Sequence, residues 1–238
     1  MAVRSVRIIG AGRAGGSFAR ALLATGRWDV QRVLGRSDLV ADAAAGVDLV
    51  LLTVPDTSVA DVAAAVRPGD AVVAHAAGSL GLGALDPHQR RAVLHPLASM
   101  PDAEVGAQRL RRAWWGLAVD GDPIAEEVVA DLDGHALHIR DGDRDRYHAA
   151  AAMAANHVVA LLGQVERVAA SIGVPLEAYL SLTRTAVDNV EALGAAAALT
   201  GPVKRGETAT IERHLAALPP EERTGYWAMK EEAEKLCT

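Results

Sequence analysis

The chain has 238 residues, half of them hydrophobic and 23% charged, with a net charge of −6, which is the composition of a globular protein with one large or two small domains. The negative charge argues against a nucleic-acid partner, and the single cysteine, Cys237, excludes an intramolecular disulfide and argues against a cysteine metal site. No apolar run approaches the roughly 20 residues that span a bilayer, and no secretory pattern precedes the first strand. We therefore expect a cytoplasmic protein without a membrane partner.

A short apolar strand, a glycine turn and an amphipathic helix are predicted for residues 6–24, VRIIGAGRAGGSFARALLA. Gly10, Gly12 and Gly15 have the G-x-G-x-x-G spacing of a dinucleotide-binding unit. In such units the middle glycine lets backbone N–H groups approach a pyrophosphate, and the helix N-terminus offers partial positive charge. We predict a cofactor loop that includes Arg13 and Ala14. The alternative is a glycine turn that only joins strand to helix.

Strands alternate with helices up to about residue 140, a pattern typical of a parallel sheet covered on both faces. The predicted strands are 6–9, 30–34, 49–54, 71–75, 92–94, 116–119 and 136–139, and the clearest helices among them are 15–24, 58–66 and 124–132. After the charged segment 140–146, only helices are predicted: 147–172, 176–193, one near 211–218, and one from Pro219 or Pro220 to Lys235. We therefore predict an α/β fold, in which a doubly wound parallel Rossmann sheet of residues 1–141 precedes an all-helical domain of residues 142–238.

The end of the second strand bears on the choice of dinucleotide. Sites that prefer NAD usually carry Asp or Glu about 20 residues past the last glycine. Here Gly35, Arg36 and Ser37 occupy that place, and a guanidinium with a hydroxyl suits the 2′-phosphate of NADP. The sequence favours NADP as the cofactor, although Arg36 and Arg13 would also be ordinary as solvated loop residues.

A second cofactor contact is predicted where the third strand ends. Val54, Pro55 and Asp56 follow the buried run DLVLLT at the carboxyl edge of the sheet, where ligands bind in such folds. We expect Val54, Pro55 and Asp56 to lie near the nicotinamide half of the cofactor.

Several segments resemble those of Rossmann-like proteins with the DUF2520 helical domain, in the 6-phosphogluconate-dehydrogenase-like superfamily: GAGRAGGSFA, LLTVPDTSV, HAAGSLG, LHPLASM, YHAAAAMAANHVVAL and LTGPVKRGETATIERHL. The resemblance extends over nearly the whole chain. It implies NADP as cofactor and a helical domain that forms a homodimer, and it names no substrate. The layout also resembles, more distantly, pyrroline-5-carboxylate reductase, ketopantoate reductase, 3-hydroxyacid dehydrogenases and prephenate dehydrogenase.

His95 is the first candidate proton donor, because histidine titrates near neutral pH and this one follows a predicted strand. The pair His95-Pro96 downstream of Gly78-Ser79 resembles an arrangement in prephenate dehydrogenases, in which a Ser and a His are hydrogen-bonded. We expect Ser79 to orient His95. A helix-capping Ser79 and a locally satisfied His95 are the structural alternative, and His148 is a further candidate.

His75 and Asn156 are two other candidates. His75 ends a predicted strand and could line the nicotinamide pocket or only satisfy backbone groups. Asn156 lies eight residues after His148 on the predicted long helix, so the two share roughly one face, and a buried Asn156 could orient a substrate or bridge two helices. If it matches the Asn of 3-hydroxyacid dehydrogenases, the catalytic Lys of that family is replaced here by Ala152.

The sequence thus predicts an NADP-dependent oxidoreductase that transfers a hydride between the nicotinamide and a small carbonyl, hydroxy or imino compound that carries a carboxylate. Arg205, in the loop after Thr200, could reach that carboxylate. The predicted catalytic residues are His95, Ser79 and Asn156, and no metal site is expected. The alternative is a non-catalytic NADP(H)-binding sensor or interaction protein, which the alanine at position 152 favours.

Overall fold

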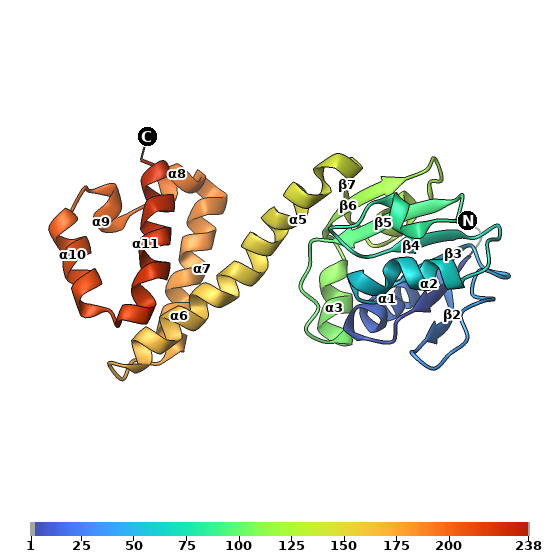
Figure 1. Ribbon diagram of the computed structural model, residues 1–238, viewed down its shortest axis with the longest axis horizontal. Coiled ribbons are helices and arrows are strands. Elements are labelled where there is room, and N and C mark those ends of the chain that lie inside the picture. Colours follow the sequence, from blue (N-terminus) through green and yellow to red (C-terminus); the bar gives the residue numbers. More distant parts are fainter. Residues whose placement is uncertain (1–2, 238) are drawn as a thin grey trace. The chain divides into compact units, whose positions relative to one another are not determined.

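The computed structural model of the protein describes residues 3–237 and divides after Ala152 into two compact units (Figure 1). The first unit holds the sheet and its helices, together with the first helical turns that follow the last strand. The second unit contains helices only.

All seven predicted strands form one sheet in the order β2-β1-β3-β4-β5-β6-β7. Their bounds are β1 Arg4–Ile9, β2 Trp28–Leu34, β3 Leu49–Leu52, β4 Val72–His75, β5 Arg91–Pro96, β6 Trp114–Val119 and β7 His135–His138. The first five strands are parallel, which confirms the predicted doubly wound arrangement and brings their carboxyl ends to one edge.

One pair of strands departs from the prediction, since β6 is antiparallel to β5, and β7 then runs parallel to β6. The connection from β5 begins and ends at the carboxyl edge, where the Leu97 amide donates to the Trp114 carbonyl over 2.8 Å. It therefore returns the chain without crossing the sheet. As a result, the start of β6 lies beside the end of β5, with Gly116 opposite His95.

Helices cover both faces of the sheet. One face packs against α1 (Arg13–Ala24), α3 (Ala103–Leu110) and α4 (Ile124–Asp131), and the other against α2 (Val59–Ala65), a 3-10 turn η2 (Leu82–Leu85) and the turns that precede β3. The sequence did not suggest α3, whose N-cap Asp102 accepts from the amides of Glu104 and Val105. Gly106 of α3 adjoins Ser17 so closely that no side chain fits there, which lets α3 pack against α1.

A nearly continuous helical run leads from the sheet into the second unit. It consists of α5 (Arg144–Ala152), a π-helical turn (Met153–His157) and α6 (Val158–Ala170). The helices that follow are α7 (Leu176–Leu193), the short α8 (Ala195–Ala198) and α9 (Gly201–Lys204), α10 (Thr208–Ala217) and α11 (Pro220–Lys235). Within this unit α6 packs against α7 and α11.

The boundary predicted from the sequence and the boundary between the two compact units of the structure differ by about one helix. The strands stop before residue 141, where the sequence places the change of fold, whereas contacts divide the chain after Ala152. The difference arises because Tyr147 of α5 contacts the sheet. None of the helices in residues 3–237 combines the length and apolar character that crossing a bilayer requires.

Candidate functional site

The glycine loop joins β1 to α1 at the carboxyl edge of the sheet. Gly10 has a φ of +118°, and a Cβ there would lie 2.6 Å from the Thr53 carbonyl oxygen. A Cβ on Gly15 would collide with the Gly10 carbonyl oxygen. Thr53, which sequence reasoning overlooked, donates its hydroxyl to Gly10 over 2.9 Å. The fold itself therefore requires the first and third glycines.

Gly12 differs, because apart from its neighbours along the chain nothing lies within 4 Å of where its Cβ would be. It is the N-cap of α1, and within the described residues no side chain caps this helix and no acidic residue occupies its first turn. The positive end of the helix dipole is thus uncompensated and open, which is the arrangement that binds phosphate groups. The predicted loop residues Arg13 and Ala14 begin this helix.

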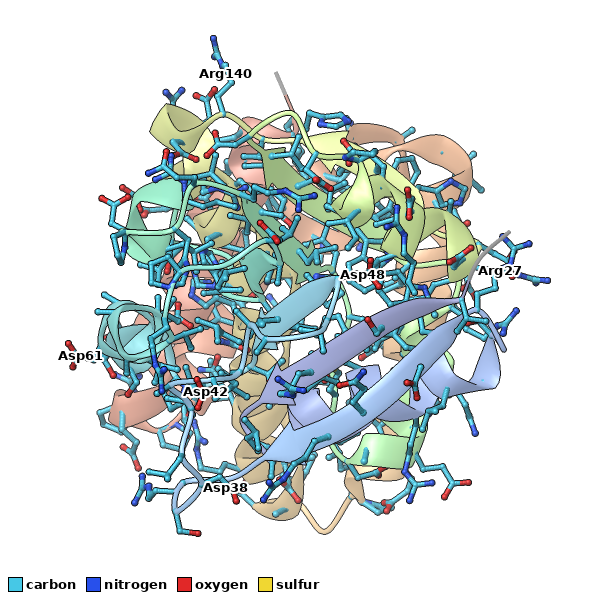
Figure 2. All side chains as sticks on the ribbon, turned by 90° about the vertical axis from the view of Figure 1, so that its right-hand side faces the viewer. Arg27, Asp38, Asp42, Asp48, Asp61 and Arg140 are labelled. Carbon is cyan, nitrogen blue, oxygen red and sulfur yellow. The ribbon has the colours of Figure 1, made fainter. Side chains whose placement is uncertain are left out.

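Arg36 and Ser37 lie beyond the end of β2, and both are exposed. In the part of the chain that the structure describes, the Arg36 guanidinium has no hydrogen-bond or ion-pair partner. The nearby acid, Asp38, is engaged: it accepts from Arg32 over 2.6 Å and from the Gly35 amide over 2.7 Å. Figure 2 labels Arg27 and Asp38 at opposite ends of β2. This loop therefore presents a free cation, while its carboxylate is neutralised.

The loops after β3 and β4 meet through a hydrogen bond from the Ser79 hydroxyl to Asp56, 2.8 Å long. Val54 is half-buried, and Pro55 and Asp56 are exposed. The expectation that Ser79 is hydrogen-bonded to His95 is wrong for this structure. Ser79 donates to Asp56, and Nδ1 of His95 is hydrogen-bonded to the Tyr147 hydroxyl.

His75 is a structural residue. Its Nδ1 accepts from the Ala77 amide over 3.2 Å, so the protonated Nε2 donates to the Gly81 carbonyl, also over 3.2 Å. The ring is fully buried, and burial lowers its pKa. With both nitrogens used by the backbone of one loop, His75 shapes the segment that carries Gly78 and leaves no group free for chemistry.

His95, near the end of β5, pairs with Tyr147 of α5. Nδ1 of His95 and the Tyr147 hydroxyl are hydrogen-bonded over 2.8 Å, and the rings meet edge to face with centroids 5.5 Å apart. Glycine makes room on both sides: a side chain at Gly116 would collide with the Tyr147 hydroxyl, and a Cβ on Gly78 would lie 2.8 Å from Nε2 of His95. The rings of His148 and His95 also meet edge to face, with centroids 5.9 Å apart.

The surroundings of His95 keep its imidazole neutral. Burial, followed by the positive potential of His148 and Arg144, lowers the pKa of His95 to about 4. The expectation that His95 titrates near neutral pH is therefore wrong, because its pKa lies well below 7. At pH 7 the ring offers a neutral N–H, which can polarise a carbonyl, rather than an imidazolium.

The guanidinium of Arg144 is buried, and none of its three nitrogens has a hydrogen bond. No other arginine among the described residues is in this state. Its side chain is 1% exposed, and its nearest acid is Asp141, with Oδ1 3.5 Å from Nε. Asp141 also accepts from the Leu82 amide over 3.2 Å. Burial lowers the pKa of Arg144. The sequence placed Arg144 in a charged turn, yet its spacing of three residues from Tyr147 at the start of a helix puts both on one face.

The two candidate residues of the second unit, Asn156 and Arg205, do not lie as the sequence predicted. Asn156 lies in the π-helical turn, where it is exposed and has no hydrogen-bond partner among residues 3–237, so the expectation of a buried Asn156 is wrong. Arg205 forms a two-point ion pair with Glu207, at 2.6 and 3.2 Å, which uses the donors proposed for a substrate carboxylate. The catalytic role of Asn156 stays a prediction.

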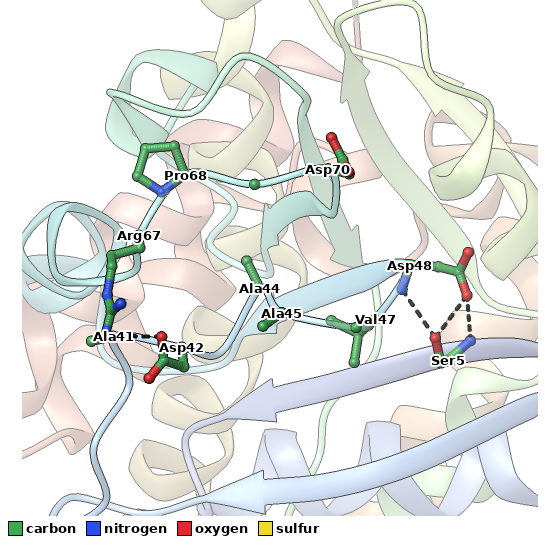
Figure 3. A pocket seen from close by; sticks show the side chains of 12 residues that line it. Ser5, Ala41, Asp42, Ala44, Ala45, Val47, Asp48, Arg67, Pro68 and Asp70 are labelled. Carbon is green, nitrogen blue, oxygen red and sulfur yellow. Dashed lines mark hydrogen bonds and ion pairs between the residues drawn. The ribbon is translucent and has the colours of Figure 1, made fainter.

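A pocket of about 650 Å³ opens at the opposite, amino edge of the sheet (Figure 3). Its polar groups satisfy one another: Asp48 accepts from the Ser5 amide and hydroxyl over 2.7 and 2.8 Å, and Asp42 pairs with Arg67 at 2.9 Å. The pocket is therefore distinct from the carboxyl-edge site. No group of His, Cys, Asp and Glu able to hold a metal ion occurs among residues 3–237.

Comparison with known proteins identifies the class of fold and then the family. Solved structures similar to this chain include a proposed NADP oxidoreductase from Bacteroides fragilis (18% identity, TM-score 0.81, 98% of each chain covered) and protein TM1727 from Thermotoga maritima (23%, 0.76, 98% of each). A third is the Plasmodium falciparum pyrroline carboxylate reductase with NADP bound (12%, 0.66, 100% of each). At these identities the likeness establishes the fold: a Rossmann domain followed by a helical domain.

The family follows from sequence. Residues 30–101 match the Rossmann-like domain, and residues 117–233 match DUF2520, a domain of unknown function. The chain belongs to the Rossmann-like proteins with a DUF2520 domain, as its motifs indicated. No curated protein matches the sequence.

Proposed function

We propose that the protein is an NADP-dependent oxidoreductase. The observation that carries this proposal is the pairing of an open glycine, Gly12, at an uncapped helix N-terminus with an unpartnered Arg36 at the end of the neighbouring strand. The first suits a pyrophosphate, and the second suits a 2′-phosphate. The pyrroline carboxylate reductase of the same fold, whose structure holds NADP, supports the same cofactor.

The residues present fit NADP better than NAD. An NAD site needs a free carboxylate to accept from the ribose hydroxyls. The carboxylate in this loop, Asp38, is already held by Arg32 and the Gly35 amide. Arg36, Ser37 and the N-terminus of α1 would hold the phosphates of the dinucleotide. The loop of Val54, Pro55 and Asp56 would border its nicotinamide half.

When bound, the reduced cofactor would supply a hydride to a small carbonyl or imino compound. His95 would then donate a proton, or a hydrogen bond, to the atom that gains negative charge. Its neutral N–H suits this task, because it needs no prior protonation at neutral pH. A substrate carboxylate and a positioning role for Asn156 remain parts of the proposal.

A cyclic imine is one substrate class worth testing, because a protonated imine reduces the demand on a protein acid. The resemblance to pyrroline-5-carboxylate reductase points the same way, and a solved reductase of that kind has this fold. The rival proposal is a protein that binds NADP(H) without turnover, which Ala152 favours. The variant His95→Asn separates the two. A reductase loses turnover but keeps NADPH affinity, whereas a binding protein loses no function.

We also propose a homodimer formed through the helical unit. Helix α7 has no buried residue in the single chain, and its apolar side chains Leu182, Val187 and Leu193 are 66%, 60% and 62% exposed. Exposed apolar side chains on a helix with no buried residue are typical of a helix that packs against a further surface. Light scattering should give twice the chain mass of 24.8 kDa, and Leu182→Asp should give a single chain. Leu39→Asp, at a 93% exposed leucine of the first unit, is the control. A wild-type monomer contradicts the proposal.

The test of the main proposal is NADPH oxidation against a panel of oxo acids and cyclic imines, alongside direct measurement of NADPH binding. Turnover of at least one class, lost in His95→Asn with NADPH affinity retained, supports an oxidoreductase. Tight NADPH binding without turnover on any member supports the rival. Absence of NADPH binding rejects both.

A further inference from the structure

Three residues outside the cofactor loops have no role yet: the buried cation Arg144, whose nearest acid is Asp141 at 3.5 Å, the phenol of Tyr147 three residues later, and the histidine bonded to that phenol. Arg144 and Tyr147 are three residues apart on α5 and share a face of the helix. The Tyr147 hydroxyl lies 2.8 Å from Nδ1 of His95. Tyr147 therefore shares a helix face with Arg144 and is hydrogen-bonded to His95.

We propose that Arg144, Tyr147 and His95 form a proton relay, in which Tyr147 passes its proton to Nδ1 of His95 as Nε2–H of His95 is given to the substrate. The relay rests on the proposed function, since it concerns the proton that follows the hydride. It adds Arg144 and Tyr147 to the candidate site and states which atom of Tyr147 and His95 gives or takes the proton.

The hydrogen bond between Tyr147 and His95 has a defined direction. Burial raises the pKa of Tyr147, so the phenol is protonated and can donate its hydrogen to Nδ1. His95 is neutral and carries one ring proton, which must then be on Nε2. Nε2 is the nitrogen beside Gly78, and among the described residues it has no hydrogen-bond partner, so its proton is not used by the protein.

Each step of the relay balances. The substrate carbon accepts the hydride with its electron pair, and the substrate oxygen or nitrogen takes the proton from Nε2 of His95. The Nε2–H bond breaks while an Nδ1–H bond forms with the proton of Tyr147. His95 stays neutral throughout, and Tyr147 is left as a phenolate. One proton from water, entering at Nε2, returns the Nδ1 proton to Tyr147.

Arg144 stabilises the phenolate that this transfer creates. Its guanidinium is buried, and its nearest acid is Asp141, 3.5 Å from Nε; the other two nitrogens have no hydrogen-bond acceptor among the described residues, which a phenolate could provide. The charge of Arg144 favours the ionised form of Tyr147, and so does a hydrogen bond with the backbone of Gly116. The titratable groups around the cluster are His75, His148, Asp56 and Asp141, and of these Asp141 is the one within 4 Å of the guanidinium.

The chain supplies a matched control in its second unit. The Tyr226 hydroxyl and Nδ1 of His214 are also 2.8 Å apart, with rings edge to face at 5.8 Å. Tyr226→Phe therefore removes the same kind of bond as Tyr147→Phe without touching His95. This separates the relay from the general effect of losing a tyrosine hydroxyl.

The experiment is nitrogen NMR of histidine-labelled protein. In the wild type and in Tyr226→Phe, His95 should carry its proton on Nε2, with Nδ1 unprotonated. In Tyr147→Phe the Nδ1 resonance should move, because its donor is gone. Retention of the wild-type His95 signals in Tyr147→Phe, or a wild-type proton on Nδ1, overturns the proposal.

Two further measurements complete the test, the pKa of Tyr147 and the kinetic constants. Phenolate absorbance, compared between each protein and its Tyr147→Phe counterpart, should show the pKa of Tyr147 rising by about one unit in Arg144→Met and recovering in Arg144→Lys. An unchanged value rejects the role of Arg144. On a substrate that is turned over, Tyr147→Phe should lower kcat at least 10-fold with little change in KM, and unchanged kcat rejects the relay. Failure of the proposed function is read separately, as absence of NADPH binding.

Discussion

The hydroxyl of Ser79 lies 2.8 Å from Oδ2 of Asp56, which ties the loop after β4 to the turn after β3. His95 takes no part in that bond, since its Nδ1 pairs with Tyr147. Ser79→Ala should therefore leave the His95 resonances in a histidine-labelled sample unchanged, whereas Tyr147→Phe moves them. A shift of Nδ1 in Ser79→Ala would restore the serine–histidine pair that the sequence suggested.

Substitutions at two glycines of the loop should have different effects, one on NADPH affinity and the other on stability. Apart from its neighbours along the chain, Gly12→Ala meets no atom within 4 Å, so its melting temperature should match the wild type, while NADPH affinity falls at least 10-fold because the methyl group blocks the phosphate. Gly15→Ala collides with the Gly10 carbonyl and should lower the free energy of unfolding by about 1–3 kcal/mol. Calorimetry and NADPH titration measure both effects. Full NADPH affinity in Gly12→Ala would mean that no phosphate lies at this turn.

Arg36 should decide the choice between the two dinucleotides. Replacing it with Asp removes a charge-assisted hydrogen bond to a 2′-phosphate and adds repulsion, so NADPH affinity should fall roughly 10- to 100-fold. NADH affinity should change little. Arg67→Asp makes the same charge change at the opposite edge of the sheet, where Arg67 pairs with Asp42, and should alter neither affinity. Equal losses for NADPH and NADH in Arg36→Asp would remove the role given to Arg36.

Burial of His95 has a consequence for stability. Burial lowers the pKa of His95 to about 4, from the 6.5 of an exposed histidine. Between these values the unfolded chain binds a proton at this residue and the folded protein does not, so the free energy of unfolding falls as the pH is lowered from 6.5 to 4. The loss should be about 2–3 kcal/mol. His75, whose pKa is also lowered by burial, acts in the same direction.

Urea titrations at several pH values measure this loss. His95→Asn should remove part of the decline between pH 6.5 and 4, and the remaining decline includes the share of His75. The wild type and the variant should have parallel profiles above pH 7, where both folded and unfolded chains are neutral at position 95. A variant whose decline equals that of the wild type would contradict the buried, neutral state of His95.

Much of the fold can be predicted from the sequence because local patterns determine it. The runs 49–52 and 71–74 are apolar throughout and buried, as strands covered on both faces are, and Gly194 ends α7 where the pattern places it. The direction of β6 could not be predicted. It depends on a return of the chain over residues 97–113, whose helix α3 carries no long apolar repeat.

The candidate site was only partly predictable, for a related reason. Gly12 and Arg36 are placed by their distance along the chain from one strand, which a sequence displays directly. The contact between His95 and Tyr147 joins residues 52 positions apart and depends on how α5 packs on the sheet. The neutral state of His95 depends on the burial that results. Neither can be read from spacing, although Arg144 and Tyr147 at helical spacing ahead of an alanine-rich stretch were a usable signal.

The central claim, an NADP site at the carboxyl edge of the sheet, is tested most directly by the affinity of the wild-type protein for NADPH and for NADH, measured side by side by calorimetric titration. The account predicts NADPH binding at least 10-fold tighter than NADH binding. Equal affinities, or no binding of either dinucleotide, would contradict it.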